Sequence, residues 1–256
     1  MLVYALVFVI RRVVILQSSG KRATMRFETS LVPGVLISRY KRFFADVQLA
    51  DGTQVTAHAA NSGSMLGCST PGSPVLLLPV HNPARKLAYT WELIQVGSSW
   101  VGVNTQRPNR LVEEAIVNGT LVELGGWENL RREVAYGHER SRADLVLTTG
   151  NKRCVVEVKG VSLAMGNRAL FPDAVTTRGT RHLRELLAEV EGGGEAALVF
   201  AVMRGDVEEV RPADEIDPEY GQTLRRAARG GVKILAYRAE LTAEEISLTT
   251  PLPVVW

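Results

Sequence analysis

Cysteine, histidine and aromatic residues are scarce in this chain. Its 256 residues include two cysteines and four histidines, and aromatic side chains make up 6% of them. Cys68 and Cys154 lie far apart and form no CxxC pair. Their number and spacing exclude a disulfide-rich scaffold and a cysteine-based zinc framework, and they predict a reducing, cytoplasmic setting.

A long uninterrupted apolar run is also lacking. Residues 1–10 are apolar, but Arg11 and Arg12 interrupt them before a short apolar run resumes at 13–16. Neither run could span a bilayer, and the basic residues follow the apolar run, whereas in a secretory signal they precede it. The small residues at 18–20 leave the secretory alternative open. We expect no membrane segment, and we interpret residues 1–25 as an extension, with Met25 as an alternative start.

The bulk composition is that of a globular protein. Hydrophobic residues make up 46% of the chain and charged residues 22%, and the formal net charge is +3. A chain of this length can bury the core of one large domain or of two modest ones. A mildly basic balance is typical of many proteins, nucleic-acid binders among them.

Residues 26–107 have the pattern of closely spaced short strands. The Asp51-Gly52 pair between two alternating runs is a strong hairpin signal. This spacing predicts a small OB-like β-barrel, although an SH3-like barrel has a similar strand count. The expected strands are 35–40, 43–49, 53–58, 74–79, 89–96 and 100–104.

The periodicity changes at residue 108. Asn109 can cap a helix over 110–118 that ends at Gly119, and Asp217-Pro218 is a second helix start. We expect this order: helix, three strands, helix, strand, helix, strand. Residues 108–256 are therefore predicted to form an α/β domain. The expected strands are 131–136, 143–147, 154–159, 196–203 and 232–237, with the middle helix over 179–190.

Three charged residues interrupt the apolar strand pair. Asp144 lies on one strand, and Glu157 and Lys159 lie two residues apart on the next, so the latter two face the same side. Two converging carboxylates suit Mg²⁺ or Mn²⁺, and a lysine beside them could orient water or stabilise negative charge. The alternative is an exposed edge strand with ordinary surface charges.

The order of these elements matches the restriction-endonuclease-like core of PD-(D/E)xK nucleases. In that core a glutamate of the first helix often joins the metal site. Glu113 and Glu114 are the candidates here, and they lie equally far from the centre of the helix's apolar face. The helical period therefore does not choose between them.

Seven segments, in order along residues 30–255, resemble the sugar fermentation stimulation protein family. The resemblance implies an OB-like domain followed by a nuclease-like domain, DNA binding, and motif positions at Asp144, Glu157 and Lys159. It favours Glu114 over Glu113, because Glu114-Ala115-Ile116 matches a family segment. Ala59-Ala60 departs from the more usual Cys-Pro. The segments are RYKRFFADV (39–47), NSGSMLGC (61–68), NPARKLAYTWEL (82–93), RREVAYGHERSRADLVL (131–147), VVEVKGVSLA (155–164), LFPDAVTTRGTRHLREL (170–186) and AYRAEL (236–241).

Basic residues, in places mixed with aromatic ones, indicate a nucleic-acid surface. Bases pair with phosphates and aromatic rings stack on nucleobases. The alternatives are that Tyr40 and Phe43 belong to the barrel core and that His182 is a structural histidine. Residues 61–65 could cradle a phosphate or form a tight turn. The predicted contacts are Arg39, Tyr40, Lys41, Arg42, Arg85, Lys86, Arg140, Arg142, Arg181 and His182.

The sequence therefore predicts a DNA-binding protein that is a candidate Mg²⁺-dependent endonuclease, with Asp144, Glu157, Lys159 and Glu114 in catalytic roles and the first two as metal ligands. Two alternatives remain open. One is a non-catalytic DNA-binding regulator of sugar-metabolism genes, as the family name implies, although no helix-turn-helix pattern is evident. The other is a nuclease that acts on RNA, because OB-like barrels accept single strands of either kind.

Overall fold

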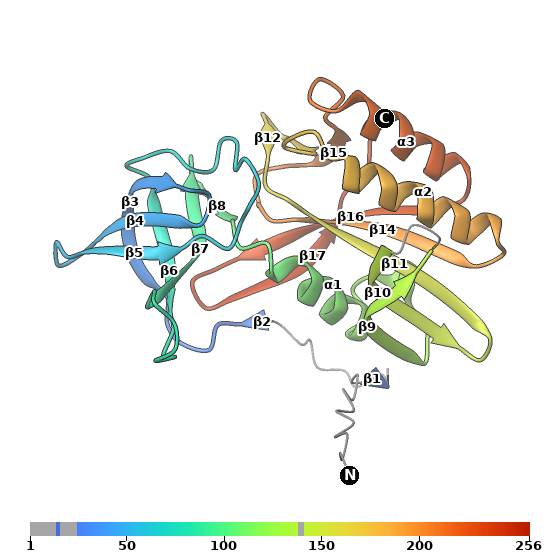
Figure 1. The fold of residues 1–256 in the computed structure, drawn as a ribbon, viewed down its shortest axis with the longest axis horizontal. Helices are drawn as coiled ribbons and strands as arrows, with labels where there is room; N and C mark the ends of the chain where they lie inside the picture. Colours follow the sequence, from blue (N-terminus) through green and yellow to red (C-terminus); the bar gives the residue numbers. More distant parts are fainter. Residues whose placement is uncertain (1–13, 16–24, 138–140) are drawn as a thin grey trace, which may run out of the picture.

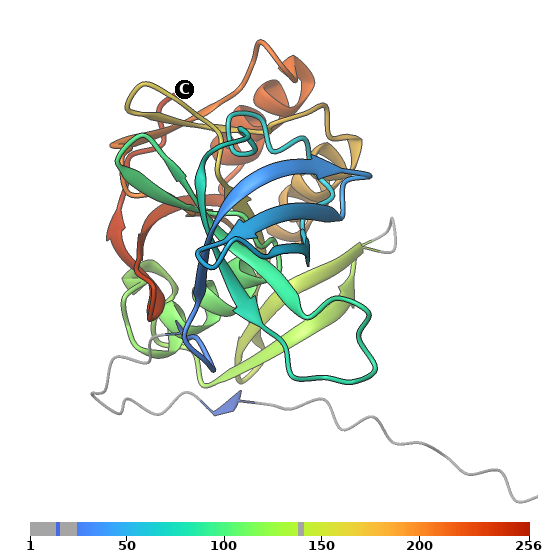
Figure 2. The ribbon, with the colours of Figure 1, turned by 90° about the vertical axis from the view of Figure 1, so that its left-hand side faces the viewer.

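The computed structural model describes residues 14–15, 25–137 and 141–256. A β-barrel lies on one side of the molecule and an α/β domain on the other (Figure 1). Figure 2, viewed from the barrel side, shows strands β3 and β4 in front of the α/β domain. The prediction for residues 1–25 falls almost wholly outside the described residues. No helix in the described part of the chain is long and apolar enough to cross a membrane.

The barrel is closed by five strands. The sheet order is β5-β4-β3-β6-β7-β8, and β5 also pairs in parallel with β7 through Ala57 and Tyr89. Leu36, Val47 and Trp91 are buried in its core. The predicted OB-like barrel is confirmed. The five strands of the closed barrel are β3 (Val32–Tyr40), β4 (Phe44–Leu49), β5 (Gln54–His58), β6 (Pro74–Pro79) and β7 (Tyr89–Val96), and the sixth strand, β8 (Ser99–Gly102), pairs with β7.

The second domain is built on an eight-stranded mixed sheet. Its order is β1-β9-β10-β11-β14-β16-β17-β2, with β11, β14 and β16 parallel. A smaller sheet of β12, β13 and β15 lies beside it. The main strands are β1 (Val14–Ile15), β2 (Met25–Arg26), β9 (Asn129–Tyr136), β10 (Ser141–Thr149), β11 (Lys152–Val161), β14 (Glu195–Val202), β16 (Lys233–Leu241) and β17 (Glu245–Pro251).

Helices cover both faces of this sheet (Figure 1). Helix α1 (Arg107–Val117) packs on the face that carries Val156, through Leu111 and its apolar neighbours. Helices α2 (Thr177–Glu191) and α3 (Pro218–Arg229) pack on the face that carries Val155. The strand pair β10–β11 is therefore buried on both sides, which confirms the predicted α/β class.

The structure corrects two local predictions. Asn109 does not cap α1, because the helix begins earlier, after Gln106, with Pro108 in its first turn. The Asn109 side chain instead donates to Asp144. Strands β12 (Ala164–Met165), β13 (Arg168–Phe171), β15 (Glu209–Pro212) and β17 and the 3₁₀ turn Val122–Leu124 were not predicted. All of these elements except β17 are short, and in β17, which lies between β16 and β2, only Ile246 and Leu248 are buried.

A buried polar network joins the two domains. Glu92 of β7 is fully buried and accepts hydrogen bonds from Arg107, at 2.6 and 3.0 Å, and from Asn104 at 3.0 Å. Met25 and Arg26 precede the barrel but pair with β17 of the second domain. The chain therefore enters and leaves the barrel on the side of the sheet.

Candidate active site

Strands β10 and β11 separate at the charged residues. Their pairing runs from Thr149–Lys152 to Leu145–Val156 and stops there. Asp144 is the next residue along β10, and its Oδ2 accepts a hydrogen bond from the backbone N–H of Val158 at 2.7 Å. A side-chain carboxylate thus takes the donor that a neighbouring strand would otherwise satisfy. We call the point where β10 and β11 separate, with Asp144, Glu157 and Lys159, the fork. It places Asp144 and Glu157 beside each other.

Glu157 is buried under α2. Its side chain is 3% exposed, and its Oε1 accepts from Lys159 Nζ at 2.8 Å and from His182 Nδ1. Its other oxygen, Oε2, is buried and has no hydrogen-bond partner among the described residues. Lys159 shares a face with Glu157, as predicted from their spacing. A buried oxygen without a protein partner is a group that a water molecule or an ion could complete.

The two carboxylates differ in acidity. Burial, and then the charge of Glu157, raise the pKa of Asp144 to about 6. Burial alone would also raise the pKa of Glu157, but the hydrogen bond from His182 and the charge of Lys159 outweigh it and lower that pKa. The fork therefore holds two carboxylates beside the single ammonium group of Lys159.

These residues fit a hard divalent ion. Two carboxylates supply the ligand type that Mg²⁺ and Mn²⁺ prefer, and one of them has a buried oxygen that no described residue contacts by a hydrogen bond. Across residues 25–137 and 141–256, no three His, Cys, Asp or Glu side chains group as a metal site. An ion here would need water, backbone or substrate oxygens as well, and Mg²⁺ commonly keeps several waters.

Neither glutamate of α1 bonds to Asp144. Glu114 accepts from Arg110 at 2.9 Å, its second oxygen is buried without a partner among the residues that the structure describes, and burial raises its pKa. Glu113 is buried and pairs with Arg132. The α1 residue that reaches the fork is Asn109, whose Nδ2 donates to Asp144 Oδ1 at 2.7 Å. Sequence reasoning missed this role of Asn109. Its place one helical turn before Glu113 puts both residues on the same side of α1, which is the pattern that could have indicated it.

His182 lies inside the site. Its side chain is 2% exposed and donates through Nδ1 to Glu157, while its Nε2 accepts from Arg178 Nε at 3.3 Å. This assignment of the tautomer follows from the two partners. The residue was predicted as a nucleic-acid contact, but its burial places it behind the carboxylate, where it holds Glu157.

On the barrel, Arg39 is bound by its own loop. Its guanidinium donates to the backbone carbonyls of Asn61, Gly63 and Ser64, and also to that of Arg42. Burial, and then the charge of Arg42, lower its pKa. Arg39 therefore braces the 61–64 loop, which differs from the free phosphate contact expected of it.

The turn between β3 and β4 is exposed and carries both bases and rings. Lys41 and Arg42 have positive φ angles of 47° and 64°, and Phe43 is 46% exposed. Tyr40 stacks on Phe44 with ring centroids 5.5 Å apart. We call residues 40–43 the basic hairpin. Its exposure leaves the cations and the Phe43 ring available to a ligand.

The remaining predicted contacts are dispersed. Arg85 is exposed and hydrogen-bonds to Thr90, and Lys86 is exposed beside it. Arg142 is exposed, with Glu133 3.8 Å away. The half-buried Arg181 has an Nε without a partner in the described part of the chain. Arg140 lies outside the described residues.

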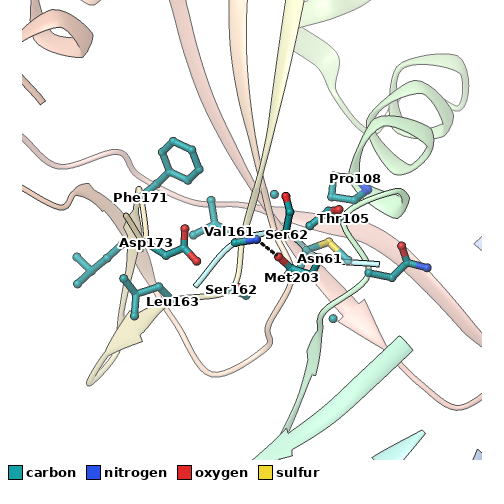
Figure 3. Close-up of a pocket in the computed structure, with 15 residues that line it drawn as sticks. Asn61, Ser62, Thr105, Pro108, Val161, Ser162, Leu163, Phe171, Asp173 and Met203 are labelled. Atoms are coloured by element: carbon teal, nitrogen blue, oxygen red, sulfur yellow. Dashed lines mark hydrogen bonds between the residues drawn. The ribbon is translucent and has the colours of Figure 1, made fainter. Parts of the chain in front are cut away.

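A cavity of about 260 Å³ lies between the barrel and the α/β domain (Figure 3). Asn61 and Gly63 line it from the barrel, and Gly160 and Asp173 line it from the second domain. A Cβ on Gly160 would lie 2.7 Å from Pro108, so only glycine fits there. Gly160 in the cavity wall directly follows Lys159 along β11.

An OB barrel followed by an α/β domain of restriction-endonuclease type defines the class of this protein. Two family models match in that order: "SfsA N-terminal OB domain" over residues 37–103, and "Sugar fermentation stimulation protein RE domain" over residues 106–245. The chain belongs to the sugar fermentation stimulation protein family.

Relatives support this membership over nearly the whole chain. The sugar fermentation stimulation protein homolog of Geobacter metallireducens is 60% identical over 231 residues, which are 90% of this chain and 100% of the relative. That of Geobacter sulfurreducens is 57% identical over 225 residues, 88% of this chain and 96% of the relative. A solved structure of Pyrococcus furiosus SfsA in complex with Ca²⁺ superposes with a TM-score of 0.82 at 25% identity, and the match covers 91% of this chain and 100% of that one.

Proposed function

We propose that this protein binds DNA and hydrolyses phosphodiester bonds with Mg²⁺ or Mn²⁺ bound at the fork. One observation carries the proposal: Asp144 and Glu157 converge where β10 and β11 separate, Lys159 is bonded to Glu157 Oε1, and Glu157 Oε2 has no partner in the described part of the chain. The Pyrococcus relative is described as a complex with Ca²⁺, another cation that takes oxygen ligands, which supports this choice of ion.

Each residue of the fork would have a separate task. Asp144 and Glu157 would hold the ion, which when bound polarises a phosphoryl oxygen and lowers the pKa of a water ligand. Lys159 uses one of its three N–H donors on Glu157, so the others can orient the attacking water or a phosphate oxygen. Asn109 and the Val158 N–H fix Asp144 from two sides.

The basic hairpin would hold the phosphodiester backbone. Lys41 and Arg42 are exposed at its tip, and Phe43 can stack on a base. Because such contacts release counterions, the affinity should fall steeply as salt is raised. We favour DNA over RNA as the ligand because the resemblance to the sugar fermentation stimulation protein family implies DNA binding.

A cleavage assay tests the proposal. Single-stranded DNA, duplex DNA and RNA are incubated with the protein in Mg²⁺, Mn²⁺ or EDTA. We expect DNA cleavage with either metal, none in EDTA, and loss of cleavage to background in Glu157→Gln. Glu128→Gln, which changes an exposed glutamate, is the matched control. Cleavage by Glu157→Gln at the wild-type rate would contradict the catalytic assignment, and metal-independent binding without cleavage would favour a regulator.

A further inference from the structure

A carboxylate of the second domain, that of Asp173, lines the cavity between the domains. Asp173 Oδ2 accepts from Ser64 Oγ at 2.8 Å and from the Met65 N–H at 3.2 Å. Its Oδ1 accepts no hydrogen bond from any described residue. Figure 3 shows the Asp173 carboxylate turned into the cavity, toward the side where Val161 and Asn61 lie. The barrel loop thus fixes one oxygen and leaves the other for a ligand.

Most of the other polar groups of the loop already have hydrogen-bond partners. The Gly63 N–H donates to Asn61 Oδ1, the Met65 N–H donates to Asp173, and Arg39 occupies the loop carbonyls. The loop therefore offers no nest of free N–H groups at Gly63 and Met65 for a phosphate. A carboxylate facing the cavity would also repel a phosphate.

The size and lining of the cavity fit a nucleobase. Its volume of about 260 Å³ is below the roughly 300–1,000 Å³ of pockets for drug-sized ligands. Leu163, Leu170 and Met203 supply apolar surface for the faces of a flat ring. Asp173 supplies an acceptor for its edge, and the exocyclic amino groups of cytosine and adenine are donors that suit it. Thymine presents an acceptor, O4, at the corresponding position.

We propose that this cavity binds a single unpaired base that carries an amino group, and that Asp173 selects cytosine or adenine over thymine there. The inference rests on the proposed function, because it requires a nucleic acid that passes from the barrel to the fork. β11 carries Lys159 at the fork and Gly160 in the cavity wall, so the selected nucleotide lies next to the phosphodiester that is cut.

Asp173→Asn tests the proposal because it keeps the hydrogen bonds from Ser64 and Met65 and replaces the cavity-facing acceptor by a donor. The asparagine oxygen still accepts from Ser64 and Met65, and its Nδ2 places a donor where the free carboxylate oxygen was. Binding of fluorescent oligo(dC), oligo(dA) and oligo(dT) to the full chain is measured by anisotropy in EDTA, so that no strand is cut. Asp51→Asn, which removes a carboxylate from the exposed β4–β5 turn, is the matched control for charge.

We expect the wild type to bind oligo(dC) and oligo(dA) about tenfold more tightly than oligo(dT), as one charge-assisted hydrogen bond allows. Asp173→Asn should reverse that ranking, and Asp51→Asn should keep it. An equal change for all three strands in Asp173→Asn, or no wild-type preference, would overturn the base pocket. If the wild type binds none of the strands and no duplex DNA, the proposed function itself fails, independently of Asp173.

Discussion

His182 donates to Glu157 across 25 residues of sequence, from a buried position on α2 to a buried position on β11. Lys159 donates to the same oxygen. Two cationic or polar donors on Oε1 leave Oε2 as the only oxygen of Glu157 without a partner in the described structure. The metal site we propose is therefore directional: Glu157 would bind an ion through one oxygen, and α2 would set its orientation.

Replacing His182 should weaken metal binding without removing the ligands. Supporting hydrogen bonds of this kind typically change metal affinity by about 10–100-fold. His182→Asn retains a donor near the position of Nδ1, whereas His182→Leu retains none. The Mn²⁺ affinity is measured by calorimetric titration. We expect the affinity of His182→Leu to fall by a factor in that range and the dissociation constant of His182→Asn to stay near the wild-type value.

The exposed His81, in the β6–β7 loop, is the control for that experiment. His81→Leu should bind Mn²⁺ as the wild type does. Equal affinities of His182→Leu and the wild type would mean that α2 does not position Glu157.

Asp144 should destabilise the metal-free protein near neutral pH. Its pKa is raised from 3.8 to about 6 on folding, so its contribution to stability is fully present below pH 4 and is lost as the pH rises through 6. Two pKa units correspond to up to about 3 kcal/mol. At about pH 7.5, above the pKa of Asp144, and in EDTA, we expect Asp144→Asn to unfold at a higher denaturant concentration than the wild type. Without EDTA, the same variant should not bind Mn²⁺.

Asp206→Asn is the opposite case. The Asp206 pKa is lowered because the buried Arg204 donates to it, so this change should destabilise the protein. If Asp144→Asn were as destabilising as Asp206→Asn, the ionised Asp144 carboxylate would not lower the free energy of unfolding as we expect.

The basic hairpin should account for part of the salt dependence of DNA binding. Each phosphate contact contributes about 0.9 to the slope of log affinity against log salt on duplex DNA. Lys41→Ala combined with Arg42→Ala should therefore reduce that slope by about 1.8. Arg226→Ala with Arg229→Ala, which removes two exposed cations at the end of α3, should leave it unchanged. Equal effects of the two pairs would indicate diffuse charge rather than a hairpin contact.

The junction between the domains should depend on Arg107. Glu92 is fully buried, and removal of its partner leaves an uncompensated charge, which typically lowers the free energy of unfolding by about 3–5 kcal/mol. We expect that loss for Arg107→Met in urea unfolding. Glu92→Met combined with Arg107→Met should regain most of it. If the double variant were as unstable as Arg107→Met, the hydrogen-bond geometry of the pair, rather than the uncompensated charge of Glu92, would account for the loss of stability.

Local patterns were enough to predict much of this molecule. The Asp51-Gly52 turn, the strand runs of the barrel and the Glu157–Lys159 spacing each depend on neighbours in sequence, and each has its expected place in the structure. Contacts between elements far apart in sequence could not be predicted in the same way. That Asn109 would serve Asp144, and that His182 would be buried against Glu157, depends on how α1 and α2 pack on the two faces of the sheet.

The most direct test of the central claim is the anomalous signal of Mn²⁺ in crystals of the wild-type protein soaked with the metal. The proposed site predicts one strong peak at the fork, bound by Asp144 and by the free Oε2 of Glu157, and no peak there in Asp144→Asn crystals. A fork without a peak in the wild type, or a peak that persists in Asp144→Asn, would contradict the claim that these two carboxylates form a metal site.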